Sequence, residues 1–136
     1  MTPPATPPTR SADSPPKVVL VVDDDETMRQ LILATLRCSP YRVLIASDGE
    51  EALAVARAHR PDLVLLDVIM PKRDGLAVCR QLKADPRTAG IEIVMLTAQA
   101  QPEDRAAAQA AGADGYLTKP FRPFDLLQRL RDRLDP

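Results

Sequence analysis

Residues 62–75 read DLVLLDVIMPKRDG, a short apolar run that stops abruptly on an acid. The run Leu63–Leu66 is unbroken, as expected for a strand that is buried on both faces of a parallel sheet. Asp67 follows it directly, and the proline, aspartate and glycine that come next predict a loop. Because open α/β sheets bind ligands at the carboxyl ends of their strands, Asp67 is predicted to lie at a binding rim. Taken alone, a solvated aspartate at a strand end would be the simpler interpretation.

Length and composition describe one globular domain. The chain has 136 residues, enough for a single full core, and 45% of them are hydrophobic, which suits a globular protein rather than a disordered one. The net charge of -1 gives no reason to expect a nucleic acid or a membrane surface as a partner. No apolar stretch approaches a membrane span, and the N-terminus lacks the basic and apolar regions of a signal peptide. We therefore expect a cytoplasmic protein.

The chain divides into a tail, residues 1–16, and one folded domain, residues 17–134. The tail holds six prolines and no large apolar residue after Met1, so it cannot bury enough surface to offset its ordering entropy and is predicted to be disordered. Cys38 and Cys79 have neither metal-ligand nor CxxC spacing, which indicates two free thiols in a reducing compartment. Only Asp135 and Pro136 follow the domain, so the sequence fits either a single-domain protein or a fragment of a longer one.

Strand and helix patterns alternate from residue 17 onward. The strands are expected at residues 18–22, 43–46, 63–66, 91–96 and 116–117. A helix is expected after each strand. The inner stripe of the first is Met28, Leu31, Ile32, Thr35 and Leu36, that of the second is Ala52, Leu53 and Ala56, and that of the third is Leu76, Cys79 and Leu82. The fourth helix is expected between Pro102 and Gly112, and the inner stripe of the fifth is Phe124, Leu127, Leu130 and Leu134. Five such units imply an α/β fold with a parallel sheet between helices, doubly wound and flavodoxin-like, in the strand order 2-1-3-4-5.

The strand ends carry matching chemistry. Strand one is followed by Asp23, Asp24 and Asp25, strand three by Asp67, and strands four and five by Thr97 and Lys119. Carboxylates that converge on one crevice repel each other unless a cation joins them, and Mg²⁺ suits a site with oxygen ligands and several waters. A carboxylate nucleophile, Mg²⁺, a lysine and a hydroxyl together predict phosphoryl transfer to Asp67.

Four stretches at strand ends carry a family resemblance: VVDDDETMRQ, LLDVIMPKRDG, IVMLTA and GYLTKPF. In this order they are highly specific, and over residues 17–134 the chain resembles the receiver domain of two-component response regulators. The resemblance implies a phosphorylation-dependent signalling switch that takes its phosphoryl group from a sensor histidine kinase or a histidine phosphotransfer protein. It implies no enzyme activity beyond the domain's own phosphorylation and dephosphorylation. The partner would be a downstream protein or a second copy, bound through helix four, strand five and helix five.

The resemblance also assigns roles to individual residues. Asp67 resembles the phosphoacceptor, and Thr97 and Lys119 resemble the pair that binds the phosphoryl group, assisted by the backbone N–H of Ala98. The implied Mg²⁺ ligands are Asp23, Asp24, Asp67 and the backbone carbonyl of Ile69. Thr97 and Tyr116 resemble the family's switch pair, and Lys119-Pro120 resembles its cis peptide. Ile69 and Gln99 lie where the family tunes phosphoryl lifetime.

Two alternatives have to be weighed. Asp23, Asp25 and Thr27 also spell DxDxT, as in haloacid-dehalogenase-like phosphatases, with Asp23 as nucleophile. Against this, the chain has no cap insertion and no acidic pair after Lys119, and LLDVIMPKRDG would be unexplained. The second alternative is an interaction module that works without phosphorylation, against which the complete acidic, Thr97 and Lys119 set argues. Asp25 and Glu26 are expected only to cap the first helix, and His59 to be solvated.

The fourth helix pattern is unusual because residues 103–111 contain five alanines and no large apolar side chain. Short side chains bury little apolar area, so we expect this helix to dock loosely and to shift on phosphorylation.

Overall fold

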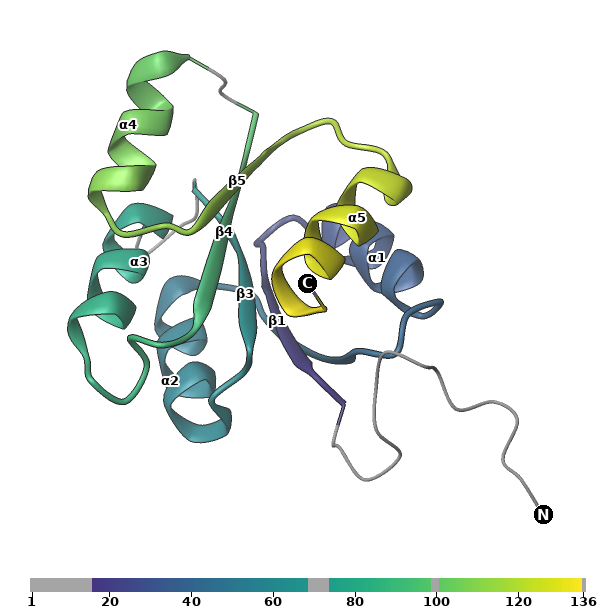
Figure 1. The fold of residues 1–136 in the computed structure, drawn as a ribbon, viewed down its shortest axis with the longest axis horizontal. Helices are drawn as coiled ribbons and strands as arrows, with labels where there is room; N and C mark the ends of the chain where they lie inside the picture. Colours follow the sequence, from purple (N-terminus) through teal and green to yellow (C-terminus); the bar gives the residue numbers. More distant parts are fainter. Residues whose placement is uncertain (1–15, 69–73, 99–100, 136) are drawn as a thin grey trace.

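The computed structural model describes residues 16–68, 74–98 and 101–135. The described residues form five strands that alternate with five helices, as the sequence predicts, and Figure 1 shows their arrangement. The strands are β1 (Val18–Val22), β2 (Arg42–Ala46), β3 (Leu63–Asp67), β4 (Glu92–Thr97) and β5 (Gly115–Thr118). The helices are α1 (Glu26–Leu36), α2 (Gly49–His59), α3 (Gly75–Ala84), α4 (Pro102–Ala110) and α5 (Pro123–Leu134). The proline-rich tail, apart from Pro16, lies outside the described residues, so its disorder stays a prediction.

All neighbouring strands run parallel, in the order β2-β1-β3-β4-β5, which confirms the predicted doubly wound α/β sheet. The chain leaves β1 for β2 on one side and later returns to β3 on the other, so the topological switch point lies between β1 and β3. Val22 pairs with Leu66, and Asp67 pairs with Leu96. The carboxyl ends of β1, β3 and β4 therefore meet at one rim.

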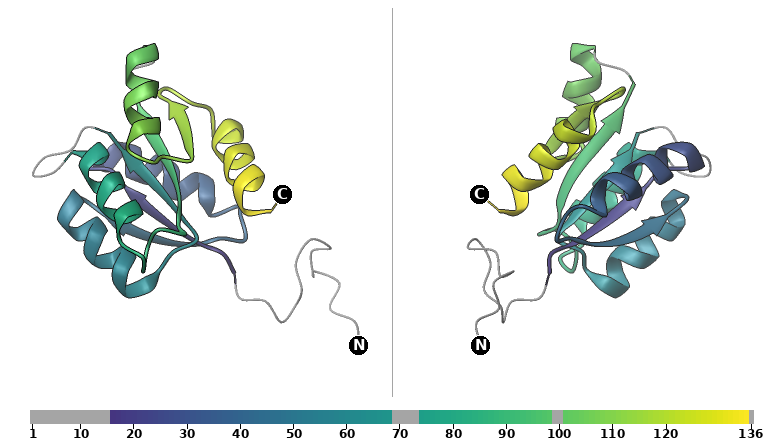
Figure 2. Two further views of the ribbon diagram at one scale, coloured as in Figure 1. Left: turned by 60° about the vertical axis from the view of Figure 1, so that its left-hand side comes forward. Right: turned by 90° about the vertical axis from the view of Figure 1, so that its right-hand side faces the viewer.

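Helices cover both faces of the sheet (Figure 2). One buried cluster joins β-strand side chains to α2, α3 and α4, and the other joins them to α1 and α5. Within β1, Leu20 belongs to the first cluster while Val19 and Val21 belong to the second, as the two-residue period of a strand requires. Burial on both faces explains why β1, β3 and β4 read as apolar runs, whereas the edge strands β2 and β5 are only partly buried.

The prediction that Phe124 belongs to the buried face of α5 is wrong. Phe124 is 64% exposed, whereas Leu126, Leu130 and Leu134 are buried against β-strand side chains. The three leucines recur every four residues and so share one face of the helix. Phe124 lies two positions before Leu126, about 200° around the helix, and therefore projects to the opposite side.

Aspartates start the helices that flank the rim. The side chain of Asp25 accepts a hydrogen bond from Thr27 N at the start of α1, and Asp74 accepts one from Ala77 N at the start of α3. Asp48 caps α2 in the same way through Glu51 N. The bond at Asp25 confirms its predicted role as a helix cap, and the three caps fix where the chain leaves the rim.

Candidate functional site

Asp23, the first residue after β1, is held by four polar contacts, one of which is the bond from its backbone N–H to the carbonyl of Ala46 at 3.3 Å. Its Oδ1 accepts a hydrogen bond from the backbone N–H of Asp25 at 2.9 Å, and its Oδ2 lies 3.1 Å from Nζ of Lys119. Its backbone carbonyl accepts a further bond, from Nη1 of Arg29 at 2.7 Å. The side chain is fully buried. A buried carboxylate is stable only when it is paired in this way, so its position is closely defined.

Three carboxylates form one cluster at the rim. Oxygens of Asp23, Asp24 and Asp67 all lie within 4.8 Å of one another. Asp23 and Asp67 are buried, whereas Asp24 is exposed, so the cluster opens to solvent on one side. Three oxygen donors with an open side fit a hard divalent cation that keeps several waters, which is the way proteins bind Mg²⁺.

Lys119, just after β5, reaches across to this cluster. Its Nζ is 3.1 Å from Oδ2 of Asp23 and 3.6 Å from Oδ1 of Asp67, and the side chain is 18% exposed. Its backbone N–H donates to the carbonyl of Thr97 at 2.7 Å, which ties the end of β5 to the end of β4. The ammonium group therefore offsets repulsion between two acids that come from different strands.

Thr97 and Ala98 lie at the end of β4, next to the acids. Thr97 is the last residue of the strand and is 2% exposed, while Ala98 is exposed. Ile69, predicted to offer its backbone carbonyl to a metal ion, lies outside the described residues. The peptide between Lys119 and Pro120 is cis, as predicted.

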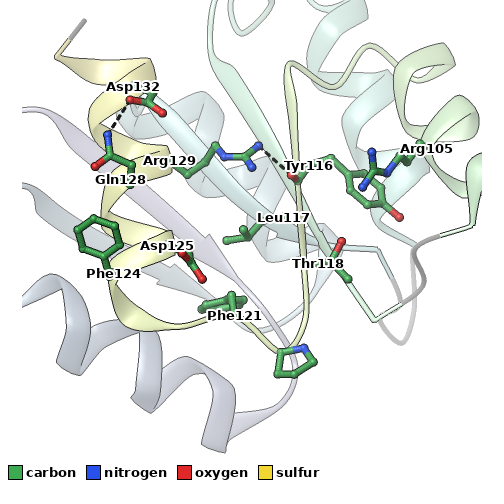
Figure 3. A pocket seen from close by; sticks show the side chains of 11 residues that line it. Arg105, Tyr116, Leu117, Thr118, Phe121, Phe124, Asp125, Gln128, Arg129 and Asp132 are labelled. Atoms are coloured by element: carbon green, nitrogen blue, oxygen red, sulfur yellow. Dashed lines mark hydrogen bonds between the residues drawn. The ribbon is translucent and has the colours of Figure 1, made fainter.

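Tyr116 is half-buried in the middle of β5, where it packs beside the core cluster that includes α4. Its backbone carbonyl accepts a hydrogen bond from Nη1 of Arg129 at 2.8 Å, and the guanidinium carbon of Arg105 lies 5.4 Å from the centre of its ring (Figure 3). The predicted switch residue thus touches both α4 and α5.

Three residues that shape the site were not predicted. Arg29 lies one turn into α1, and no spacing rule indicates that its guanidinium turns back to the carbonyl of Asp23. Gly75 ends the quoted motif, but only the structure shows that its N–H donates to the carbonyl of Val68 at 2.7 Å and that a Cβ there would overlap the carbonyl oxygen of Asp67. Arg105 reads as a solvated charge on an alanine-rich helix.

The geometry brings three carboxylates and a lysine together at the carboxyl rim of a flavodoxin-like sheet, and comparison with known proteins identifies the family. The family model for the response regulator receiver domain matches residues 19–131. The chain therefore belongs to the response regulator receiver domain family. These domains are phosphorylation-dependent signalling modules of two-component systems rather than enzymes that turn over a diffusible substrate.

Individual relatives fit this family. The DNA-binding response regulator MtrA of Mycolicibacterium paratuberculosis is 43% identical over 116 residues, which are 85% of this chain and 50% of MtrA. The alkaline phosphatase synthesis transcriptional regulatory protein PhoP of Bacillus subtilis is 44% identical over 115 residues, 85% of this chain and 47% of PhoP. The chain thus spans about half the length of these relatives.

Two solved structures match almost the whole of their own chains. The chemotaxis protein CheY4 of Vibrio cholerae superimposes with a TM-score of 0.84 at 38% identity, covering 88% of this chain and all of that one. The receiver domain of sensor histidine kinase PA1611 from Pseudomonas aeruginosa, solved with a magnesium ion in its active-site cleft, gives a TM-score of 0.81 at 33% identity, covering 88% and 98%.

The phosphatase alternative finds no support. The family match is to receiver domains, and the two aspartates of the DxDxT spelling are already engaged. Asp23 is fully buried with Lys119 on one oxygen and a backbone N–H on the other, and Asp25 caps α1.

Among the described helices, none is long and apolar enough to cross a membrane.

Proposed function

We propose that the domain accepts a phosphoryl group on Asp67 from the phosphohistidine of a sensor histidine kinase or a histidine phosphotransfer protein. The observation that supports this most is the position of Lys119, with its ammonium nitrogen 3.1 Å from Asp23 and 3.6 Å from Asp67. A buried carboxylate beside an ammonium group, at a rim that opens to solvent through Asp24, is a nucleophile that a donor phosphate can reach.

The transfer needs one bond to form and one to break. A carboxylate oxygen of Asp67 attacks phosphorus, while the bond between phosphorus and the donor's imidazole nitrogen breaks and its electron pair stays on that nitrogen. Lys119, the hydroxyl of Thr97 and the backbone N–H of Ala98 donate hydrogen bonds to the phosphoryl oxygens. Lys119 is held beside Asp67 before the donor arrives. The negative charge on the phosphoryl oxygens is therefore neutralised with little rearrangement of the protein.

The acid cluster fits Mg²⁺ by its donor set. Asp23, Asp24 and Asp67 would hold the ion, with the backbone carbonyl of Ile69 as a further proposed ligand. When bound, Mg²⁺ supplies positive charge for the phosphoryl oxygens. Lys119 would then be free to turn from Asp23 to the phosphoryl group, because the ion takes over the neutralisation of that acid.

Phosphorylation would be read out on the face made by α4, β5 and α5. Thr97 is drawn to the phosphoryl group, and Tyr116 follows toward the space that it leaves. The same face carries a groove of about 400 Å³ whose lining includes Arg105, Tyr116, Phe124 and Arg129 (Figure 3). Phe124, which is 64% exposed at this groove, provides an aromatic anchor for a downstream protein or a second copy of the chain.

The same residues would also catalyse hydrolysis of the acyl phosphate, which resets the switch. A cytoplasmic location follows from the proposed kinase partner, and no direct contact with nucleic acid is proposed for this domain. Whatever else the whole protein does would be controlled through the α4, β5 and α5 face.

Phosphorylation by a small-molecule donor tests the proposal. Acetyl phosphate and Mg²⁺ should give an acid-stable, base-labile acyl phosphate on Asp67, located by mass spectrometry of the digested protein. Asp67→Asn should abolish the label, whereas Glu50→Gln, an exposed residue on α2, should leave it unchanged. Labelling that persists in Asp67→Asn and disappears in Asp23→Asn would refute the proposed acceptor.

A further inference from the structure

Tyr116 lines two cavities. A groove of about 400 Å³ over β5 and α5 and a smaller cavity of about 160 Å³ between α4 and β5 are both lined by Tyr116 and by Arg105. The guanidinium carbon of Arg105 lies 5.4 Å from the ring centre, within the range of a cation–π contact. Tyr116 therefore lies next to open space and beside the guanidinium of Arg105.

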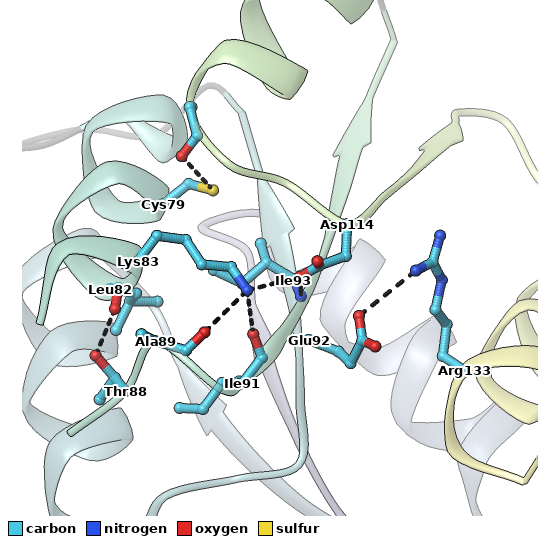
Figure 4. A network of polar contacts seen from close by, with 11 residues as sticks. Cys79, Leu82, Lys83, Thr88, Ala89, Ile91, Glu92, Ile93, Asp114 and Arg133 are labelled. Carbon is cyan, nitrogen blue, oxygen red and sulfur yellow. Dashed lines mark hydrogen bonds and ion pairs between the residues drawn. The ribbon is translucent and has the colours of Figure 1, made fainter. Parts of the chain in front are cut away.

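The C-terminal end of α4 is firmly attached to the neighbouring elements (Figure 4). Sγ of Cys79 on α3 donates a hydrogen bond to the carbonyl of Ala111 at 3.3 Å. Nζ of Lys83 lies 2.8 Å from Oδ2 of Asp114, and the same oxygen accepts a bond from Ile93 N in β4. Gly112 turns this corner with a φ of 96°, and a Cβ there would run into the side chain of Lys83. This end of the helix is therefore fixed to α3 and β4.

The body of α4 is held much less firmly. Ala108 is its only buried residue, and an alanine contributes little apolar area. Arg105 lies one turn before Ala108 and carries the long side chain that reaches from α4 to the ring in β5. The Arg105–Tyr116 contact therefore couples the loosely held part of the helix to the ring.

We propose that Arg105 is a positioning residue that holds the ring of Tyr116 against α4 in the unphosphorylated protein and so opposes the switch. This inference rests on the proposed function, because it needs a phosphorylated state in which Tyr116 moves. A contact made in only one of two states shifts their equilibrium by its own strength. For an exposed cation–π contact the shift is roughly two- to fivefold in favour of the inactive state.

The chain allows a direct spectroscopic test. It has no tryptophan and two tyrosines, so in a Tyr41→Phe background Tyr116 is the single aromatic fluorophore of this class. Arg105→Gln removes the charge, Arg105→Lys restores a cation, and Arg131→Gln removes the charge of an exposed arginine on α5 as a matched control. The readouts are acrylamide quenching of Tyr116 and the affinity for beryllofluoride with Mg²⁺, a mimic of the phosphoryl group.

In the absence of beryllofluoride, quenching should rise in Arg105→Gln, because one face of the ring is uncovered, and should return toward the original value in Arg105→Lys. With beryllofluoride bound, all variants should be quenched equally, since the contact is then absent. The affinity for beryllofluoride should be roughly two- to fivefold higher in Arg105→Gln, the factor expected for one exposed cation–π contact. It should be unchanged in Arg131→Gln.

Two results would overturn the role of Arg105. One is an Arg105→Gln variant that binds beryllofluoride no more tightly than the unsubstituted chain. The other is a quenching difference that persists in the bound state, which would show that Arg105 only packs against the ring. A different result, in which the unsubstituted chain fails to bind beryllofluoride, would instead contradict the proposed function.

Discussion

Nζ of Lys119 lies 3.1 Å from Oδ2 of Asp23, although 96 residues separate them in the chain. The contact connects the chain just after β5 to the chain just after β1. It places a cation beside a carboxylate that solvent does not reach. It is therefore both a structural ion pair and a part of the proposed phosphoryl site.

Replacing Lys119 should destabilise the protein most when no divalent ion is present. Lys119→Met leaves the buried Asp23 carboxylate without a cation beside Asp67, which should cost about 1–3 kcal/mol, below the figure for a fully enclosed pair because Lys119 is partly exposed. Thermal unfolding with and without Mg²⁺ measures this, and added Mg²⁺ should recover part of the loss. Lys17→Met, at the opposite end of β1, serves as the control. Equal losses in both variants would contradict a special role for Lys119.

Asp24 should contribute to metal binding without contributing to stability. Asp24→Ala removes an exposed carboxylate from the acid cluster and should weaken Mg²⁺ binding by about tenfold or more. The melting temperature should stay the same or rise, because repulsion between like charges is relieved. Isothermal titration with Mg²⁺ and a melting curve test both parts, with Glu50→Ala as the control. A large drop in melting temperature would rule out this assignment.

Gly75 should be needed for the position of Asp67. Gly75→Ala places a Cβ against the carbonyl oxygen of Asp67, so the start of α3 has to move, at a cost of about 1–3 kcal/mol. Labelling by acetyl phosphate should become slower at the same time. Gly90→Ala is the matched control, because a Cβ at Gly90 meets nothing within 4 Å. The prediction fails if the two variants have the same stability and labelling rate.

The two thiols should differ in reactivity. Burial raises the pKa of Cys79 to about 11, whereas Cys38 is exposed. A thiol reagent at pH 8 should therefore modify Cys38 alone in the native protein, and the Cys38→Ser variant should react only after unfolding.

Between pH 9 and 11 the unfolded chain loses the Cys79 proton that the folded chain keeps, so stability should fall as the pH rises. Cys79→Ala should weaken this pH dependence, and rapid native modification of Cys38→Ser would disprove the assignment.

Hydrogen exchange should reveal which segment responds to phosphorylation. With beryllofluoride bound, protection should change most between Ala98 and Tyr116, because α4 has one buried residue and Arg105 links it to the switch ring. Residues of α2 should change little, since Ala52, Leu53 and Ala56 are all buried in the core. Comparable changes in α2 and α4, or none near Ala98, would count against this segment as the mobile one.

The sequence alone determined the fold and the chemical class of the site. Buried parallel strands read as apolar runs, and an acid, a threonine or a lysine directly after such a run has to lie at the carboxyl rim. Asp23, Asp24, Asp67, Thr97 and Lys119 could therefore be assigned to one crevice before any distance was known. The start of the first helix was equally readable, because Asp25 acts on a backbone group only two residues away.

Only the tertiary structure decided which face of α5 is buried and which side chains meet across elements. Phe124 and Leu126 are both apolar, and which of them is buried depends on how α5 is rotated against the sheet. The spacing of apolar residues along the helix does not reveal this rotation. Three further contacts join separate elements or cross a loop. They are the Arg105–Tyr116 contact, the bond from Arg29 to the carbonyl of Asp23, and the close approach of Gly75 to Asp67. Such contacts depend on the angles at which helices pack on the sheet, and these angles are set by the core as a whole.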